Sequence, residues 1–283
     1  MKEMTLRELQ LFALEILKDV HQFCTQNNIK YSLYGGTLLG AIRHQGFIPW
    51  DDDIDIIMPR EDYDRFCNLY TSDNYKLINR NNDSSYQLAY TRVCDIKRTR
   101  YKAVEPCSKH TTGVWIDVFP ADGCPSNEDE IPAFYLNNKA LFEETEHVRW
   151  SLCSYSNEWN RVSQMYGKLS AFKRLVSLFK SKIYYTISGK SNTCIQNLMS
   201  SSRTYRFSDS KFWASFTCPY KHVVYNPKAD FSSTILLKFE DEQFQAMNGY
   251  DGYLRRVYGD YLELPPKEQQ VPPLRNWYTF YWL

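Results

Sequence analysis

The N-terminal part of the chain shows the periods of both amphipathic helices and half-buried strands. Between residues 5 and 26, apolar side chains recur every three or four positions, which predicts a helix, and Thr5 with Glu8 forms a candidate capping box at its start. Residues 29–34 alternate between apolar and polar positions as a strand does, and residues 60–69 return to the helical period. We therefore expect helices and strands to be closely mixed here.

The most informative alternation lies in residues 53–58, which read Asp-Ile-Asp-Ile-Ile-Met. Side chains two positions apart in a strand point to the same side. Ile54 and Ile56 are therefore expected in the core, while Asp53 and Asp55 project together from the other face. Two neighbouring carboxylates repel each other, which favours a bound cation over a purely structural role.

A glycine turn precedes this strand. Gly35 and Gly36 interrupt the strand over residues 29–34, and Thr37 is the expected N-cap of a short helix over residues 38–43. Backbone N–H groups at a glycine turn before a helix N-terminus bind phosphate oxygens. The turn is therefore the predicted phosphate cradle.

Further strands are predicted over residues 75–79, 86–96 and 114–119. The last is apolar and aromatic apart from Asp117, and Pro120 is expected to end it. A lone carboxylate in an apolar strand is costly to bury unless it is paired or binds a metal. Asp117 is therefore a third candidate metal ligand.

The second half of the chain differs in charge. Residues 130–158 are helical in pattern, and from Trp159 to Ser208 the chain has many basic residues but no acidic one. Within residues 168–188, a helix would carry six apolar side chains on one face: Leu169, Phe172, Leu175, Val176, Phe179 and Ile183. We expect this helix to pack on the core with a solvated basic face. The alternative is a basic amphipathic helix that lies on a membrane surface or on a lipid-linked anionic acceptor.

These patterns divide the chain into three segments. Residues 1–129 form the expected catalytic core, residues 130–229 a mostly helical basic insertion or second lobe, and residues 230–283 a C-terminal segment that returns to the core. The predicted fold class is α/β, of the α+β kind, with a mixed sheet.

Composition narrows the classes of function. The chain has 283 residues, a net charge of +1 and a pI of about 7.5, so bulk charge predicts no binding of nucleic acid. Its eight cysteines include no C-x-x-C pair, which favours reduced thiols. The N-terminus lacks a signal-peptide pattern, and no stretch approaches the roughly 20 apolar residues of a membrane span. We therefore expect a cytoplasmic protein, with peripheral contact at the inner membrane surface as the alternative.

The three carboxylates predict an oxygen-rich site of the kind that Mg²⁺ prefers, with Mn²⁺ as the alternative. An EF-hand loop beginning at Asp51 would need glycine where Ile56 stands. A glycosyltransferase D-x-D motif stays an alternative, but it does not predict the glycine turn. The ordered set of glycine turn, alternating aspartate strand and later single-aspartate strand is typical of the nucleotidyltransferase superfamily, with its polymerase β-like fold.

The sequence resembles the LicD family, whose relatives include fukutin and fukutin-related protein. The resemblance rests on residues 34–44, 46–55 and 62–63, on residues 115–120 with 122–123, and on residues 253–254, 258–261 and 264–266. It implies a nucleotidyltransferase-type core, and it offers no motif for residues 130–225.

The resemblance implies transfer of phosphocholine, or a related phospho-alcohol, from a CDP-linked alcohol donor to a sugar hydroxyl, with release of CMP. The acceptor would be a glycan or lipid-linked glycan of a surface polysaccharide or lipopolysaccharide. A CDP-choline donor would call for an aromatic cage around its quaternary ammonium group. Two alternatives stay open: a nucleotidyltransferase that adds NMP to a small molecule, and a glycan-binding pseudoenzyme.

The candidate catalytic residues follow from these motifs. We assign metal binding to Asp53, Asp55 and Asp117, and Asp117 or a neighbouring carboxylate is also a candidate acceptor for the proton of the attacking hydroxyl. Arg43 is a candidate contact for phosphate or the leaving CMP. His44 is a candidate for either a catalytic or a structural role.

Apart from Arg92, the candidate residues for supporting the metal ligands and binding the donor come from the same motifs as the candidate catalytic residues. Asp51 and Asp52 are expected to order the loop and support the metal ligands. By the resemblance, Arg92 lies on a strand near the site. The donor-binding candidates are Gly35, Gly36, Thr37, Asp52 and Arg92.

Overall fold

The computed structural model describes residues 1–103, 113–151, 159, 162–163, 167–188, 190–272 and 278–283. The helices are α1 (Leu6–Gln26), α2 (Gly35–His44), α3 (Arg60–Leu69), α4 (Ile131–Ser151), α6 (Lys168–Ile187), α7 (Lys190–Ser202) and α8 (Tyr250–Tyr258). The strands are β1 (Lys2–Glu3), β2 (Ser32–Leu33), β3 (Asp55–Pro59), β4 (Tyr75–Ile78), β5 (Thr91–Asp95), β6 (Thr99–Ala103), β7 (Trp115–Gly123), β8 (Phe212–Ala214), β9 (Asn226–Pro227), β10 (Thr234–Phe239), β11 (Glu242–Met247) and β12 (Tyr278–Trp282).

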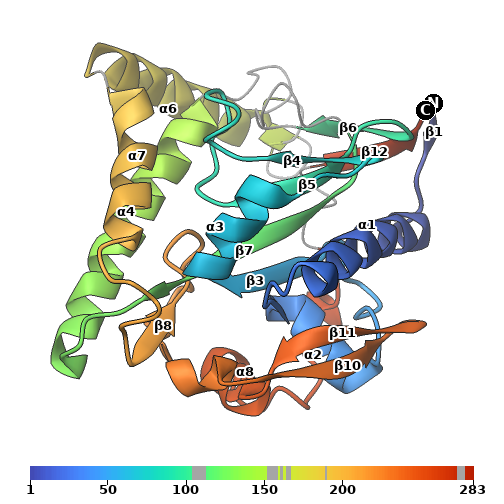
Figure 1. The fold of residues 1–283 in the computed structure, drawn as a ribbon. Helices are drawn as coiled ribbons and strands as arrows, with labels where there is room; N and C mark the ends of the chain where they lie inside the picture. Colours follow the sequence, from blue (N-terminus) through green and yellow to red (C-terminus); the bar gives the residue numbers. More distant parts are fainter. Residues whose placement is uncertain (104–112, 152–158, 160–161, 164–166, 189, 273–277) are drawn as a thin grey trace.

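A mixed sheet forms the centre of the molecule, in the order β2-β3-β7-β5-β4, and β8 and β9 extend it beside β7. β3 and β7 are parallel, whereas β2, β5 and β4 each run antiparallel to their neighbour. Helices α1 and α3 contact the strands of this sheet (Figure 1). The predicted mixed α/β architecture is therefore confirmed.

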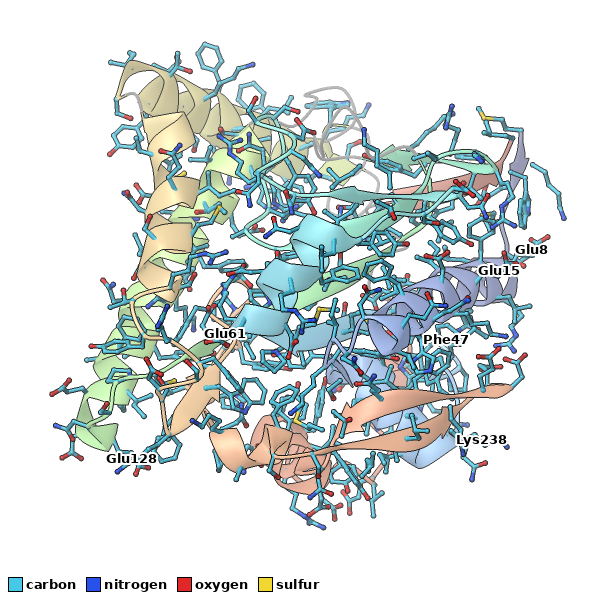
Figure 2. The ribbon with its side chains drawn as sticks, viewed as in Figure 1. Glu8, Glu15, Phe47, Glu61, Glu128 and Lys238 are labelled. Carbon is cyan, nitrogen blue, oxygen red and sulfur yellow. The ribbon has the colours of Figure 1, made fainter. Side chains whose placement is uncertain are left out.

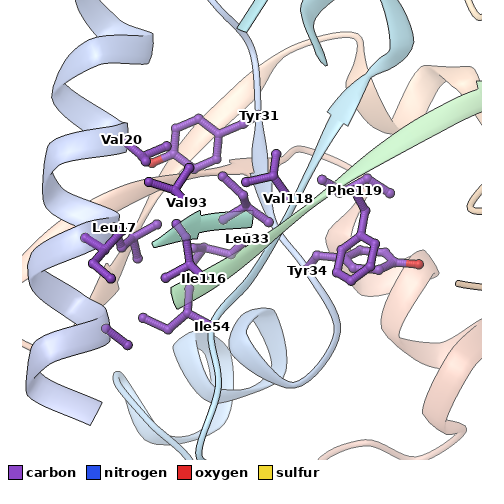
Figure 3. Packing of buried hydrophobic residues seen from close by; sticks show 14 of the residues in the cluster. Leu17, Val20, Tyr31, Leu33, Tyr34, Ile54, Val93, Ile116, Val118 and Phe119 are labelled. Atoms are coloured by element: carbon purple, nitrogen blue, oxygen red, sulfur yellow. The ribbon is translucent and has the colours of Figure 1, made fainter. Parts of the chain in front are cut away.

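Helix α1 forms as its sequence predicts. The Thr5 hydroxyl accepts a hydrogen bond from the Glu8 N–H, and the Glu8 carboxylate accepts one from the Thr5 N–H, so the capping box is present. In Figure 3, Leu17 and Val20 of α1 lie among the buried side chains of the sheet, such as Ile116. Full burial of each such aliphatic side chain contributes about 1.5–3 kcal/mol to folding.

The glycine turn differs from the prediction. Helix α2 begins at Gly35, which has a φ of +53°, so both glycines belong to its first turn rather than to a preceding loop. Thr37 is not the N-cap; its hydroxyl accepts a hydrogen bond from the Asp55 N–H at 2.9 Å. The Thr37 side chain therefore anchors the first residue of β3 to α2, and Asp53 lies just before that strand.

Strand β7 continues past Pro120, contrary to the prediction. Pairing with β5 ends at Val118, and pairing with β8 begins at Asp122. Pro120 lies in the gap between these two ladders, where no hydrogen bond from its missing N–H is required. Strand β6, which the sequence pattern did not predict, pairs with β12.

Helices α4, α6 and α7 form a lobe beside the sheet, on the left in Figure 1. The expected packing of α6 is wrong in one respect. The helix contacts α4 and α7, and its buried residues are Ala171, Leu178 and Tyr185, the last of which packs with Val148 of α4 and Cys194 of α7. The apolar face that was expected to be buried is largely exposed. These three buried residues are seven positions apart and therefore form a narrow seam along one side of the helix, which leaves the other side in solvent.

The C-terminal segment returns to the core at two places. The β10–β11 hairpin packs on α2 and β2, and Figure 2 shows Phe47 beside it. β12 pairs with both β6 and β1, which brings the two termini together (Figure 1). The segment boundaries at 129 and 229 stay predictions, and β8 and β9 show that the chain already rejoins the central sheet before residue 229.

Within the described residues, none of the helices combines the length and apolarity that crossing a bilayer requires. The cysteines that the structure describes are free thiols: Cys24, Cys67, Cys94, Cys124, Cys194 and Cys218.

Candidate active site

Two predicted carboxylates meet where the parallel strands of the sheet begin. Asp55 of β3 lies directly opposite Asp117 of β7 in the ladder. The Asp117 N–H donates to the Ile54 carbonyl at 2.9 Å, which fixes this register. Ile54 and Ile56 are completely buried, as the alternation predicts, so the carboxylates project from the opposite face.

Three further carboxylates gather before β3. Oxygen atoms of Asp51, Asp52 and Asp53 lie within 4.8 Å of one another. Asp52 is the most buried of the three and also lines a small cavity beside α1 and β12. Asp51, which we expected to play a supporting role, is therefore a member of the same group as the predicted ligand Asp53.

The carboxylates before β3 and those on β3 and β7 influence one another's pKa values. Burial raises the pKa of Asp53 well above its usual range, and the charges of Asp55, Asp51, Asp52 and Asp117 raise it further. Burial and the neighbouring Asp117 also raise the pKa of Asp55. Burial, together with the charge of Asp52, raises the pKa of Asp51 to about 6. Such mutual repulsion is relieved by a divalent cation, and an all-oxygen donor set suits Mg²⁺ or Mn²⁺.

The two glycines bring the start of α2 against these carboxylates. A Cβ added at Gly36 would lie only 2.7 Å from Oδ2 of Asp51, and one added at Gly35 would lie 3.4 Å from Oδ2 of Asp55. Only glycine permits the first contact without displacement of the carboxylate. The N–H groups of the first helical turn, with the positive end of the helix dipole, therefore lie beside the acidic cluster, where a phosphate group could also be held.

Arg92 holds Asp117 in place. Its Nε donates to Oδ1 of Asp117 at 2.7 Å, and its guanidinium lies 4.2 Å from the centre of the Trp115 ring. Burial raises the pKa of Asp117, and the positive charges of Arg92 and Arg149 act in the opposite direction. Arg149 belongs to α4, so the helical lobe contributes positive charge to the site, a role that no sequence motif indicated.

Arg43 and His44 lie at the other end of α2. The Arg43 guanidinium donates to the backbone carbonyls of Tyr261 and Glu263, each at 3.0 Å. Arg43 thereby fixes the segment after α8. The His44 ring makes an edge contact with Trp50, and partial burial, followed by the charge of Arg43, lowers its pKa. Both residues thus contribute to the walls around the site, and their catalytic roles stay predictions.

A cavity of about 630 Å³ opens from the acidic cluster. Gly36 and Asp51 line its inner end. Its walls combine aromatic and acidic side chains with the loop after α8: Trp50, Tyr258, Asp260, Tyr261 and Glu263.

Tyr258 lines the cavity and also lies close to the acidic cluster. Burial raises its pKa, and the charges of Tyr34, Asp55, Asp51 and Asp53 raise it further. Its hydroxyl lies 3.8 Å from the Cβ position at Gly35. Our assignment of site residues left Tyr258 out, although it lies in the 253–266 motif that supports the family resemblance.

Comparisons with known proteins identify the family of this chain. A family model described as "LicD/FKTN/FKRP, nucleotidyltransferase domain" matches residues 28–159, the range that holds α2 and all five aspartates. The chain is 33% identical over 275 residues to the lipopolysaccharide cholinephosphotransferase LicD of Haemophilus influenzae, covering 96% of this chain and 97% of that protein. The chain belongs to the LicD family.

The predicted family is thereby confirmed. Uncharacterized proteins of Rickettsia prowazekii and Rickettsia typhi are each 58% identical to this LicD-family chain over 48 residues, or 17% of its length. The polymerase β-like form of the core stays a prediction.

Proposed function

We propose that this LicD-family chain transfers phosphocholine from CDP-choline to a sugar hydroxyl of lipopolysaccharide or another surface glycan and releases CMP. The Haemophilus influenzae relative, named as a lipopolysaccharide cholinephosphotransferase, matches nearly the whole chain. The observation that carries the proposal is the pairing of Asp55 with Asp117 next to Asp51, a carboxylate that lines a cavity with aromatic walls.

The cavity lining favours a cationic donor head group. Trp50, Tyr258 and Tyr261 offer aromatic rings, and the carboxylates of Asp51, Asp260 and Glu263 outnumber the one guanidinium in the lining, that of Arg43. Aromatic faces attract a quaternary ammonium group by about 0.5–2 kcal/mol each, and carboxylates reinforce that attraction. A neutral head group such as ribitol would gain neither contribution, so choline fits this lining best.

The acidic cluster fits a divalent cation. Asp55 and Asp117 lie opposite each other in the ladder, and Asp53 lies in a separate group with Asp51 and Asp52. We propose that Asp53, Asp55 and Asp117 would hold Mg²⁺ or Mn²⁺, with Asp51 as a further candidate ligand. When bound, the cation neutralises the negative charge of the donor diphosphate. Arg92 keeps the Asp117 carboxylate oriented, and the N–H groups of Gly36 and its neighbours are our candidates for binding a phosphate oxygen.

The proposed reaction is the transfer of a substituted phosphoryl group. The acceptor hydroxyl oxygen forms a bond to the phosphorus that carries choline, and the bond from that phosphorus to the oxygen bridging it to CMP breaks. CMP leaves with that oxygen, and a carboxylate of the cluster takes the hydroxyl proton. Asp117 is our candidate for this step, because burial raises the pKa of its carboxyl and makes it a better base.

The test is to incubate the full chain with Mg²⁺, choline-free lipopolysaccharide and either CDP-choline or CDP-ribitol. We expect CMP release that requires the acceptor and is fastest with CDP-choline. Release of pyrophosphate from a nucleoside triphosphate would support the nucleotidyltransferase alternative. A folded protein that releases no CMP from any CDP-alcohol would contradict the proposal.

A further inference from the structure

Helix α6 is apolar on two opposite sides. One side, formed by Ala171, Leu178 and Tyr185, is buried, and the helix contacts α4 and α7. The other side is open to solvent: Phe172 is 59% exposed and Phe179 56%. Large apolar side chains exposed together along one helix face mark an interaction surface.

The exposed side is a continuous stripe. At about 100° per residue, all of its apolar side chains except Tyr184 fall within roughly a quarter of the helix circumference, on the side away from the buried residues. The stripe extends to the end of the helix, where Tyr184 and Ile187 border an open apolar hollow of about 450 Å³. The exposed apolar residues of α6 are Leu169, Phe172, Val176, Phe179, Ile183, Tyr184 and Ile187.

Lysines border the stripe on both flanks. The same helical rotation places Lys168 on one flank and Lys173 and Lys180 on the other. The sequence contains no acidic residue from Trp159 to Ser208, so no carboxylate of this region offsets their charge. An apolar stripe flanked by lysines is the arrangement of a helix that lies in the plane of a membrane interface.

A lipid surface fits this stripe better than a second copy of the chain does. In a two-fold symmetric contact through α6, each copy would present the same lysines to its partner. These like charges would oppose association. Anionic headgroups would instead pair with the lysines while the acyl boundary covers the phenylalanines.

We propose that α6 docks the protein on a bilayer that carries anionic lipids. Its buried seam keeps it attached to α4 and α7, so the helix lies along the surface as part of the folded lobe. This inference does not depend on the identity of the donor or acceptor, and it goes beyond the proposed transfer reaction.

The test is co-sedimentation of the full-length protein with phosphatidylcholine vesicles that contain about 30% phosphatidylglycerol. We expect binding to these vesicles, at least about tenfold weaker binding to pure phosphatidylcholine, and a progressive loss of binding as salt rises. No binding to the anionic vesicles at low salt would overturn the proposal.

Paired variants locate the contact. Phe172→Asn with Phe179→Asn, and separately Lys173→Glu with Lys180→Glu, should each weaken vesicle binding about tenfold or more. Circular dichroism should show unchanged folding, because these side chains lie outside the buried seam.

The matched control changes the same residue classes elsewhere. Leu236→Asn with Lys238→Glu alters exposed positions of β10, on the opposite side of the view in Figure 2. This control should bind vesicles like the wild type, and an equal loss of binding would overturn the assignment to α6.

A second copy of the chain is the alternative occupant of the stripe. It would be identified if the protein did not bind lipid and sedimentation velocity showed a dimer that the phenylalanine variant dissociates. CMP release with a soluble acceptor should be the same in all α6 variants, which separates this test from that of the proposed reaction.

Discussion

The acidic face of the central sheet and the helical lobe differ in where their charged and apolar residues lie. At the sheet, the apolar residues Ile54 and Ile56 are buried and the carboxylates beside them converge on one site. In α6, phenylalanines lie in solvent and the charged residues around them are basic. We therefore propose a small cation as the partner of the clustered charge at the sheet, and an extended lipid surface as the partner of the dispersed charge and apolar stripe of α6.

The largest predicted effect is at the sheet. Asp55→Asn should lower CMP release about a thousandfold or more, because metal-assisted charge stabilisation is worth several kcal/mol and each 1.36 kcal/mol is tenfold in rate. The measurement is the initial rate with CDP-choline, together with Mn²⁺ binding by calorimetry, which should also be lost. Asp73→Asn changes an exposed aspartate outside the site and serves as the control. Unchanged Mg²⁺-dependent turnover in Asp55→Asn would refute the metal assignment.

The ion pairs at the two regions should differ in their contribution to stability. Asp122→Ala removes the buried partner of Arg60, which donates to it at 2.6 and 2.8 Å, and should lower the free energy of unfolding by about 3 kcal/mol or more. Arg203→Ala breaks the partly exposed pair with Asp64 that joins the lobe to α3, and should cost less than about 1 kcal/mol. Urea unfolding measures both. Equal costs would contradict the distinction between the buried core and the exposed lobe.

A smaller catalytic effect is expected at the glycine turn. Gly36→Ala would place a methyl group 2.7 Å from the Asp51 carboxylate and force it to move, so we expect turnover to fall about 10- to 100-fold, as for residues that orient metal ligands. Steady-state kinetics of Gly36→Ala in an Asp51→Ala background gives the control. If Gly36→Ala acts through Asp51, it should lower turnover little further in the Asp51→Ala background. A full additional loss of turnover would show that the substitution acts through the helix backbone instead.

The smallest effect concerns the donor head group. Tyr258→Ala should raise KM for CDP-choline about tenfold through loss of an aromatic contact to the quaternary ammonium group, whereas KM for CDP-ribitol should change little. Tyr258→Phe keeps the ring and should retain most of the affinity. Parallel losses for both donors in Tyr258→Ala would show that the tyrosine shapes the site without recognising choline.

Sequence patterns predicted the elements whose burial follows directly from their period. The start of α1 and the two faces of β3 are examples, since a capping box and the pleat of a strand act locally. Pro120 within β7 could not be foreseen, because its tolerance depends on the gap between two partner strands.

The partners of the site residues were harder to predict than the residues themselves. The sequence placed Arg92 near the site, but only the register of β5 on β7 shows that it pairs with Asp117. Helix α6 presents a related difficulty. Both of its faces are apolar, so the period alone does not determine which one packs, and the neighbouring helices decide.

The central claim is that the acidic cluster serves transfer of phosphocholine rather than of a nucleotide. The most direct test is mass spectrometry of the acceptor, combined with quantification of CMP, after incubation of the full chain with CDP-choline, Mg²⁺ and choline-free lipopolysaccharide. The account predicts that the acceptor gains one phosphocholine group for each CMP released. An acceptor that gains a nucleotide, or that remains unmodified by a folded, Mg²⁺-loaded protein, would contradict it.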